Sequence, residues 1–208
     1  TIGDAEKVGV KAKISSIDFP LIMKRMHEFV EPDREAMTRG IEHAKNLTWY
    51  PETGEFIGEY KIKTGSKVIT APKIVIAAGS RTLVPDIPGL KETGFLDNVS
   101  ALRLKKPPKN LLILGGGYIA YEYGHFFSAM GTHVTILERN PRILKMEEPE
   151  ISDVAQKRFG RFAKIYTYFE AVRVEKEGGV KVVHAKDLAQ KKLYKFKTDE
   201  IMLALGRR

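Results

Sequence analysis

The sequence predicts an α/β fold that combines a parallel sheet with a β-meander. Between residues 111 and 162, short apolar runs alternate with helical patterns, as in a parallel sheet. Between residues 164 and 196, short β-type segments surround a Gly178-Gly179 turn, as in a meander. The chain of 208 residues is 43% hydrophobic, which is enough for the core of one large domain or two small ones.

The first part of the chain divides into a helical segment and a β segment. Residues 17–46 carry apolar side chains at helical spacing, and Pro32-Asp33 predicts a kink or a restart within this helix. The pattern then changes to that of a hairpin, with its turn at Thr64-Gly65-Ser66. The apolar run at residues 74–77 predicts a buried strand that follows the hairpin.

The second part of the chain is predicted to follow a regular order. An irregular stretch at residues 80–110 precedes it, and the adjacent prolines Pro107 and Pro108 indicate a domain boundary. The expected elements are a strand at 111–114, a helix at 118–130, a strand at 133–137, a helix at 150–162, the meander at 164–196, which begins with 165–167, and a last buried strand at 201–205.

The charge and the missing residue types exclude several classes of function. The formal net charge is +9, but the lysines are scattered and no nucleic-acid motif occurs, so we expect a solvated surface and no nucleic-acid partner. No apolar run approaches the roughly 20 residues of a membrane helix. There is no signal peptide, so we expect a cytoplasmic protein without a membrane partner. The absence of Cys excludes disulfides and a thiol nucleophile, and the five His lack metal-ligand spacing, so we expect no metal site.

The sharpest motif follows the strand at 111–114 and opens the next helix. Gly115, Gly117 and Ala120 occupy the three small positions of G-x-G-x-x-A. Gly115 permits a tight turn, Gly117 lets a diphosphate approach the backbone, and Ala120 lets the helix pack near the strand. Because the amides of a helix N-terminus favour anions, the motif predicts a Rossmann-like dinucleotide site.

An acid at the end of the second strand supports this interpretation and bears on cofactor choice. Glu138 lies 23 residues after Gly115, close to the roughly 20 expected for the acid that binds the adenosine ribose. Its carboxylate accepts hydrogen bonds from ribose hydroxyls and repels a 2′-phosphate, which favours NAD(H). Arg139 and Arg142 point the other way, because a guanidinium can hold that phosphate. We therefore expect NAD(H) as the cofactor, with NADP(H) as the less favoured alternative.

Two further segments are similar to those of a known family. Residues 73–81 read KIVIAAGSR and are followed by PDIPG at 85–89, while residues 199–208 read DEIMLALGRR. Together with the Gly115 motif, they resemble the class I pyridine nucleotide-disulfide oxidoreductases, which include dihydrolipoamide dehydrogenase, mycothione reductase and mercuric reductase. The words GYIA at 117–120 and THVT at 132–135 are most similar to the first two of these branches.

The resemblance implies a domain order and a set of cofactor contacts. Residues 1–103 would be part of an FAD-binding domain, residues 104–205 an inserted NAD(P)-binding domain, and residues 206–208 the return toward the FAD domain. Ala78, Gly79 and Ser80 would lie near FAD. The NAD contacts would be Gly115, Gly116, Gly117, Tyr118, Ile119, Ala120, Glu122, Glu138 and Gly206, with Ala171 as a weaker candidate.

Two side chains of the predicted helix have competing interpretations. Tyr118 matches an aromatic residue that covers the nicotinamide pocket in some members of the family, and a partly exposed residue at a helix start is an equal alternative. Glu122 lies one turn further on the same face. The resemblance implies that it approaches the contact between nicotinamide and flavin, whereas an ordinary helical Glu is a solvated charge.

The resemblance also implies a function for a longer parent protein. Such an enzyme passes hydride from NAD(P)H to FAD and then, through a dithiol, to a small-molecule or protein-bound disulfide, as a homodimer. This sequence lacks the first FAD loop, the C-x₄-C pair and the dimerisation domain, and it carries Glu52 where relatives have a Gly near the adenine. We therefore expect a middle segment that is inactive alone and holds no catalytic residue. The alternative is a non-catalytic NAD(H)-binding module.

Overall fold

The computed structural model describes residues 2–208, and side chains from residue 5 onward. The chain forms two compact units. The larger comprises the residues up to Met23 together with Ser80–Arg208, and the smaller comprises Lys24–Gly79. The predicted boundary between residues 103 and 104 falls inside the larger unit and stays a prediction. Thr1, the first residue of the predicted FAD-binding segment, lies outside the described residues.

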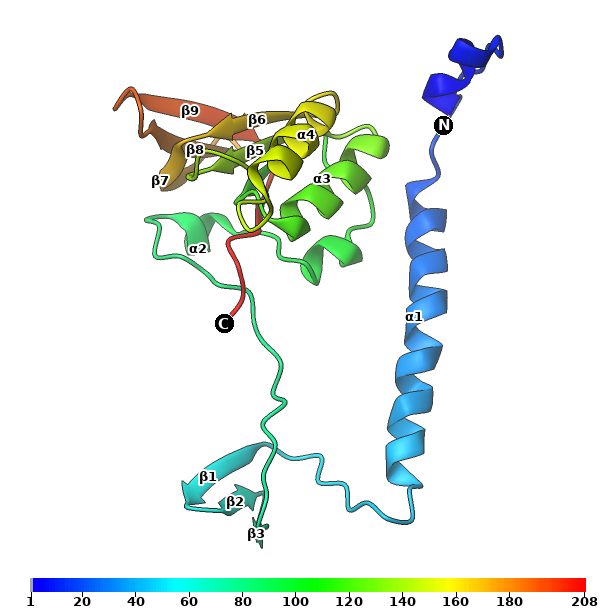
Figure 1. The fold of residues 1–208 in the computed structure, drawn as a ribbon, viewed down its shortest axis with the longest axis vertical. Coiled ribbons are helices and arrows are strands. Elements are labelled where there is room, and N and C mark those ends of the chain that lie inside the picture. The colour runs from blue at the N-terminus through cyan, green and yellow to red at the C-terminus, as the bar shows by residue number, and fades with distance from the viewer. Residues whose placement is uncertain (1) are drawn as a thin grey trace. The chain divides into compact units, whose positions relative to one another are not determined.

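A parallel sheet forms the centre of the larger unit (Figure 1). Its strand order is β10-β4-β5-β6, and its edges are therefore β10 and β6. In the register, Leu112 lies opposite Ile201 on one side and Thr135 on the other. The strands are β4 (Asn110–Leu114), β5 (His133–Glu138), β6 (Ala163–Thr167) and β10 (Glu200–Leu203).

The strand β4 is buried on both faces, as an apolar run without alternation indicates. Residues 111–114 are each 2% exposed or less. On one face, Ile113 packs near Gly124 of α3 (Tyr118–Ala129), and α4 (Pro149–Phe159) covers α3 through Phe159. On the other face, Leu112 and Leu114 share a core cluster with residues of the meander. The predicted α/β class is therefore confirmed.

The meander consists of three antiparallel strands in the order β7-β8-β9. Gly178 and Gly179 form the predicted turn between β7 and β8, both with positive φ. Phe169 of β7 and Phe196 of β9 pack edge-on against each other and against Tyr166 of the parallel sheet. The strands are β7 (Phe169–Glu177), β8 (Val180–Asp187) and β9 (Leu193–Thr198).

Three predictions for the second half need correction. Residues 165–167 belong to the parallel sheet and not to the meander, because Ile165 pairs in parallel with Ile136. The helix predicted to reach residue 162 ends at Phe159, where Gly160 follows as its C-cap. The last strand ends at Leu203, and residues 204–206 leave the sheet to line a cleft.

The segment before β4 is held against the sheet. It contains α2 (Leu90–Thr93) and the 3₁₀ turn η2 (Ser100–Arg103). Residues 81–83 run antiparallel to 206–208, with hydrogen bonds in both directions between Arg81 and Arg208. The proline stretch is also fixed, because Thr132 donates a hydrogen bond of 2.7 Å to the carbonyl of Pro108.

The long helix α1 (Phe19–Glu42) begins after a short 3₁₀ helix, η1 (Ile2–Val8). Asp18 caps it by accepting a 2.9 Å hydrogen bond from the amide of Leu21. The helix continues through Pro32 without a restart. Phe19 is buried beside Phe126 and Phe127. The predicted helix is present, and Leu21, Phe29, Val30 and Met37 of its apolar stripe are exposed.

The smaller unit contains an antiparallel sheet of three strands. They are β1 (Gly54–Gly58), β2 (Lys61–Thr64) and β3 (Lys67–Thr70), and the predicted turn at Gly65 has a positive φ. The strand predicted at residues 74–77 is wrong. Val75 is 89% exposed and Ile76 is 74% exposed. No strand of the described chain pairs with this run, so its backbone has no ladder to join.

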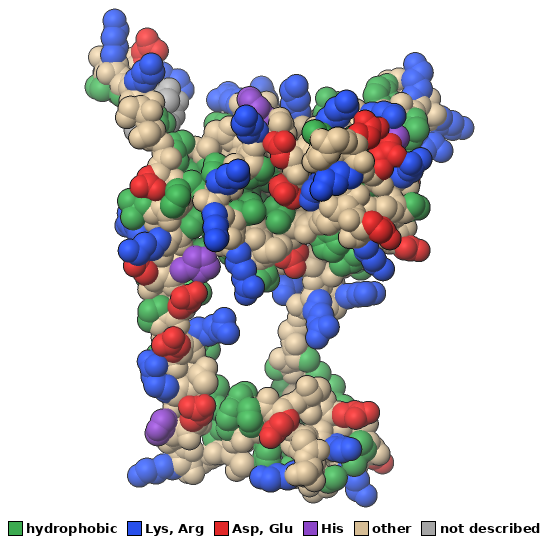
Figure 2. Space-filling model, turned by 180° about the vertical axis from the view of Figure 1, so that it is seen from behind, with side chains coloured by type: hydrophobic (Ala, Val, Ile, Leu, Met, Phe, Trp, Pro, Cys, Tyr) green, Lys and Arg blue, Asp and Glu red, His purple; other side chains and the backbone are tan. Residues whose placement is uncertain are grey.

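Charge is distributed without a single basic patch on the face that Figure 2 shows, where acidic side chains lie among the lysines and arginines. None of the described helices is both long and apolar enough to cross a bilayer. Within the same described residues, no group of three His, Asp or Glu is arranged to hold a metal ion.

Candidate functional site

A cleft of about 800 Å³ lies at the carboxyl ends of β4, β5 and β10. This is the edge at which open α/β sheets bind their ligands. The cleft is lined by residues 114–119, 137–140, 144–146, 169–172 and 204–206, and by Leu83 and residues 85–87. The predicted glycine motif therefore lies at the centre of the site, between the sheet and the meander.

Gly115 makes the tight turn that the motif requires. Its φ is +101°, and a Cβ at this position would lie 2.4 Å from the carbonyl oxygen of Ala204. Its amide donates a 2.9 Å hydrogen bond to the carbonyl of Leu137. Because both conformation and space exclude a side chain, Gly115 fixes the path of the chain between β5 and β10.

The next two glycines differ in what surrounds them. A Cβ on Gly116 would lie 2.8 Å from the side chain of Ile143, so this residue is needed for packing. A Cβ on Gly117 would meet nothing within 4 Å. Gly117 is the N-cap of α3 and no side chain caps this helix start. No side chain therefore competes for the first amides of this helix, which favours an anion at its start.

Glu138 points back toward the glycine loop and is only 7% exposed. One carboxylate oxygen accepts a 2.6 Å hydrogen bond from the amide of Gly116. The other accepts a 2.7 Å bond from the amide of Asn140 and a second from its side-chain amide. A carboxylate offers about four acceptor positions, so acceptor capacity remains for a hydroxyl donor in the cleft.

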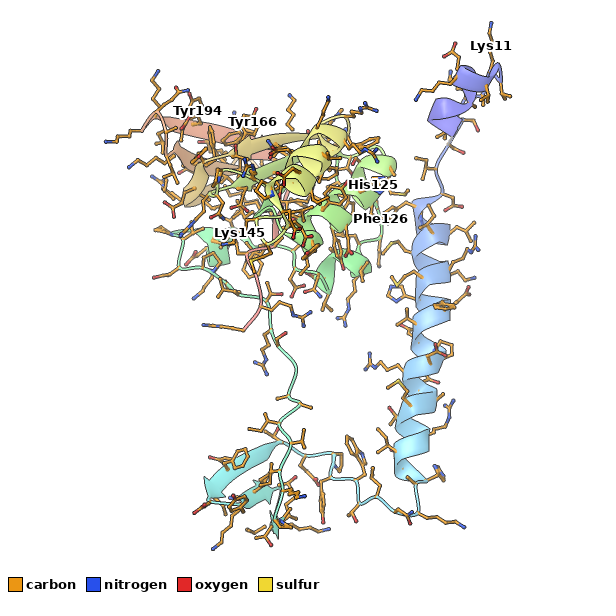
Figure 3. The ribbon with its side chains drawn as sticks, viewed as in Figure 1. Lys11, His125, Phe126, Lys145, Tyr166 and Tyr194 are labelled. Atoms are coloured by element: carbon orange, nitrogen blue, oxygen red, sulfur yellow. The ribbon has the colours of Figure 1, made fainter. Side chains whose placement is uncertain are left out.

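Each of the two arginines that favoured a 2′-phosphate is paired with an acid, and only Arg139 lines the cleft. Arg139 lines the cleft and forms an ion pair of 3.4 Å with Glu170. Arg142 does not line the cleft, and its guanidinium lies 2.9 Å from Asp153 of α4. A third cation, Lys145, lines the cleft from the loop between β5 and α4 (Figure 3).

The loop that carries Lys145 is fixed against the glycine motif. Leu144 has φ +50°, which is unusual for a residue with a side chain. Its amide donates a 2.7 Å hydrogen bond to the carbonyl of Gly116, and its carbonyl accepts a 2.9 Å bond from the hydroxyl of Ser152. Sequence reasoning missed this loop. Its position directly after Glu138, before the next helix, was the available signal.

Tyr118 lies at the start of α3 and lines the cleft with its side chain partly exposed. Its hydroxyl donates a hydrogen bond to the carboxylate of Glu147, and this bond raises the pKa of Tyr118 above its ordinary value. Ile119 lines the cleft beside it.

The opposite wall brings together segments that are distant in the sequence. Ala171, on β7, and Gly206, with φ +114°, both line the cleft, and their contacts with NAD stay predictions. Leu83 and residues 85–87 complete this wall. Residues 85–87 belong to a segment that was used to identify the family, and neither they nor Leu83 were expected in the dinucleotide site.

Five predicted residues do not line the cleft. Ala120 is fully buried and lets α3 pack, in agreement with its predicted packing role. Glu122 is exposed and lies outside the lining. Ala78, Gly79 and Ser80 are exposed, and the carbonyl of Ser80 accepts a 2.7 Å hydrogen bond from Arg207. Contacts of these residues with FAD stay predictions.

Comparisons with known proteins agree with this arrangement. Residues 6–208 match the family described as pyridine nucleotide-disulphide oxidoreductase. A mercuric reductase from Bacillus cereus is 30% identical over 97% of this chain and 32% of its own length. A dihydrolipoyl dehydrogenase from Chlamydia trachomatis is 28% identical over 77% of this chain and 35% of its own length.

A solved structure covers the whole chain. The HOCl-induced flavoprotein disulfide reductase RclA from Escherichia coli superposes with a TM-score of 0.82 at 28% identity, over 100% of this chain and 45% of its own. The chain thus spans about a third of the curated relatives named here, and less than half of this structural neighbour. On the family match and these similarities, the chain belongs to the class I pyridine nucleotide-disulfide oxidoreductases.

Proposed function

We propose that this chain binds NAD(H) in the cleft above residues 115–117. The parent protein would be an FAD-dependent NAD(P)H:disulfide oxidoreductase. The observation that carries the proposal is Gly117, where a Cβ would enter empty space at an uncapped helix start. An anionic diphosphate fits this position, because backbone amides and the helix dipole both favour it.

The environment of Glu138 supports NAD(H) over NADP(H). Its buried carboxylate can still accept a hydrogen bond from a ribose hydroxyl. A 2′-phosphate at the same place would meet a negative charge, while Arg139 and Arg142 are paired with acids. Lys145 and Arg139 both line the cleft and favour the phosphate, so the discrimination is expected to be moderate.

The parent enzyme's flavin and acceptor are part of the same proposal. FAD, when bound, would take hydride from the nicotinamide and pass electrons on toward a disulfide. The sequence contains no Cys, so this chain has no thiol for that step. Ala78, Gly79 and Ser80 line no part of the described cleft. The second candidate function is a non-catalytic NAD(H)-binding module, because a chain without Cys cannot carry out the thiol step itself.

The central test is the Gly117→Val variant of the purified chain, titrated with NADH. We expect the affinity to fall by about 10-fold or more, or about 1.4 kcal/mol, because the branched side chain occupies the volume that the diphosphate needs. Gly40→Val is the matched control, since a Cβ on Gly40 in α1 also meets nothing within 4 Å. Unchanged affinity in a folded Gly117→Val variant contradicts the proposed site.

Cofactor choice is tested by Glu138→Ala, titrated with NADH and NADPH. We expect NADH to bind less tightly and NADPH to bind as well or better, so that the preference narrows by about 10-fold, which is the effect of one lost hydrogen bond to a charged group. An equal change for both cofactors would mean that Glu138 only supports the fold through its bond to Gly116. An absorption spectrum of the same protein shows whether this chain retains a flavin.

A further inference from the structure

The six methionines of this chain differ in how far solvent reaches their side chains. Met23 and Met202 are buried, and two others are partly buried. In contrast, Met37 is 69% exposed and Met146 is 81% exposed. Because an oxidant in solution reaches the thioether of an exposed methionine most readily, Met37 and Met146 are the two favoured sites of oxidation in this chain.

Met146 is the only one of the six that lines the dinucleotide cleft. It follows Lys145 on the loop between β5 and α4 (Figure 3 labels Lys145). The amide of Leu144 donates a 2.7 Å hydrogen bond to the carbonyl of Gly116, which fixes the start of this loop. The amide of Glu147 donates a 2.9 Å bond back to the carbonyl of Leu144. Both neighbours of the Lys145-Met146 pair are thus held, and Met146 keeps a defined place in the cleft wall.

The position of Met146 is also where the adenine of the dinucleotide is expected, and this step rests on the proposed function. There the diphosphate binds above Gly117, and Glu138 accepts a hydrogen bond from the adenosine ribose. The adenine then extends beyond Glu138, along the cleft residues that follow it in the chain, 139–140 and 144–146. A thioether makes favourable contacts with aromatic rings. Bound dinucleotide would therefore both contact and cover the sulfur of Met146.

We propose that Met146 is a site of reversible oxidation that controls the affinity for the dinucleotide. The oxidant is a peroxide. The thioether sulfur attacks one peroxide oxygen, the O–O bond breaks as the S–O bond forms, and the hydroxide that leaves takes the proton of the transferred oxygen and becomes water. The sulfur loses two electrons, which reduce the peroxide.

The sulfoxide changes the chemistry of the cleft wall. Its oxygen is polar, whereas the thioether that it replaces is apolar and flexible. Packing an adenine against the sulfoxide removes water from this oxygen and returns no hydrogen bond, which is unfavourable. Oxidised Met146 therefore weakens the binding of the dinucleotide, and reduction of the sulfoxide restores it.

The first experiment measures how fast hydrogen peroxide oxidises each methionine of the purified chain, by peptide mass spectrometry. We expect Met37 and Met146 to react fastest and Met202 slowest. Saturating NAD⁺ should slow the oxidation of Met146 by about 3-fold or more, because oxidation follows exposure and the adenine covers the sulfur. Met37 is the matched control, since it is exposed on α1 and does not line the cleft, so its rate should not change. Equal rates at Met146 with and without NAD⁺ overturn the proposal.

The second experiment compares NADH affinity before and after peroxide treatment, with the peroxide removed before the titration. The unmodified chain should bind about 3- to 10-fold more weakly after oxidation, which lies within the range of one lost contact between sulfur and an aromatic ring. Methionine sulfoxide reductases of both stereospecificities should restore the affinity. Met146→Leu has no sulfur at this position, so its affinity should be the same before and after treatment. Met37→Leu should lose affinity on oxidation as the unmodified chain does.

Met146→Gln tests the same idea without an oxidant. Glutamine is polar and of similar length, so this variant should bind NADH more weakly than Met146→Leu. Two results would overturn the role of Met146: oxidised Met146→Leu that loses as much affinity as the unmodified chain, or Met146→Gln that binds as tightly as Met146→Leu. Both leave the proposed function intact, because the unoxidised chain still binds NADH. Failure of the folded, unoxidised chain to bind NADH refutes the proposed function and the role of Met146 with it.

Discussion

Two apolar runs in this chain have the same length and similar composition but opposite surroundings. Residues 111–114, LLIL, form β4 and are each 2% exposed or less. Residues 74–77, IVIA, form no strand, and Val75 is 89% exposed. The first run has β5 and β10 on its two edges, helices on one face and the meander on the other. The second has no strand partner among the described residues.

The difference shows what an apolar run specifies. Val, Ile and Leu make a segment able to fill a buried strand. The backbone hydrogen bonds and most of the buried area, however, come from neighbours that lie far away in the sequence. For β4 these neighbours are residues 133–138 and 200–203, both within this chain. The run at 74–77 has the same capacity, which remains unused in the described chain.

The largest expected effect tests this contrast directly. We expect Leu112→Ala to lower the free energy of unfolding by about 2–5 kcal/mol, because it leaves a cavity between the sheet and the meander. Val75→Ala removes an exposed side chain and should change the free energy by less than about 0.5 kcal/mol. Urea unfolding followed by circular dichroism gives both values. A large cost for Val75→Ala would mean that this run is covered in solution.

The same principle explains how much of the fold could be predicted. Local signals were sufficient for β4, α3 and β5, because the glycine motif joins them in an obligatory order. They were insufficient for β6, which is only partly buried, so its pattern resembles that of a meander strand. Whether Ile165 pairs with Ile136 in parallel is decided by the tertiary arrangement, which a local pattern does not contain.

The residues of the candidate site also fall into those that the sequence could predict and those that it could not. Gly115, Gly117 and Glu138 were predictable, since each follows from a motif with a physical role at fixed spacing. Leu144 and Glu147 were not, because their roles depend on where a loop folds back after β5. No residue type is required at either position by local structure alone, so these contacts follow only from the tertiary structure.

A second prediction compares two helical glycines, one in each unit. A Cβ on Gly124 of α3 would lie 2.7 Å from Cζ of the buried Phe159, and we expect Gly124→Ala to destabilise the chain by about 1–3 kcal/mol. A Cβ on Gly40 of α1 meets nothing within 4 Å. Gly40→Ala should therefore stabilise by about 0.5–1 kcal/mol, because alanine loses less conformational entropy in a helix. If thermal unfolding shows that both variants are stabilised, α3 can shift away from Phe159.

The smallest expected effect concerns two glutamates in ion pairs. Glu175 on β7 accepts a 2.5 Å hydrogen bond from the buried His184 and also pairs with Arg173. The hydrogen bond from His184 is the main reason that the pKa of Glu175 is lowered, while partial desolvation opposes it. Glu35 of α1 pairs with Arg39 at 3.4 Å, and both side chains are well exposed. Exposed pairs of this kind contribute little to stability.

The pH dependence should distinguish these two glutamates. Because the folded chain lowers the pKa of Glu175, its ionised form stabilises the fold at pH values above the ordinary glutamate pKa of about 4.3. That contribution is lost as the pH falls through the lowered value. Glu175→Gln should therefore be less stable than the unmodified chain at pH 7, and the gap should close in acid. Glu35→Gln should follow the unmodified chain at both pH values. Urea midpoints at pH 7 and in acid measure the gap, and a constant gap for Glu175→Gln would assign its effect to packing against His184 and not to charge.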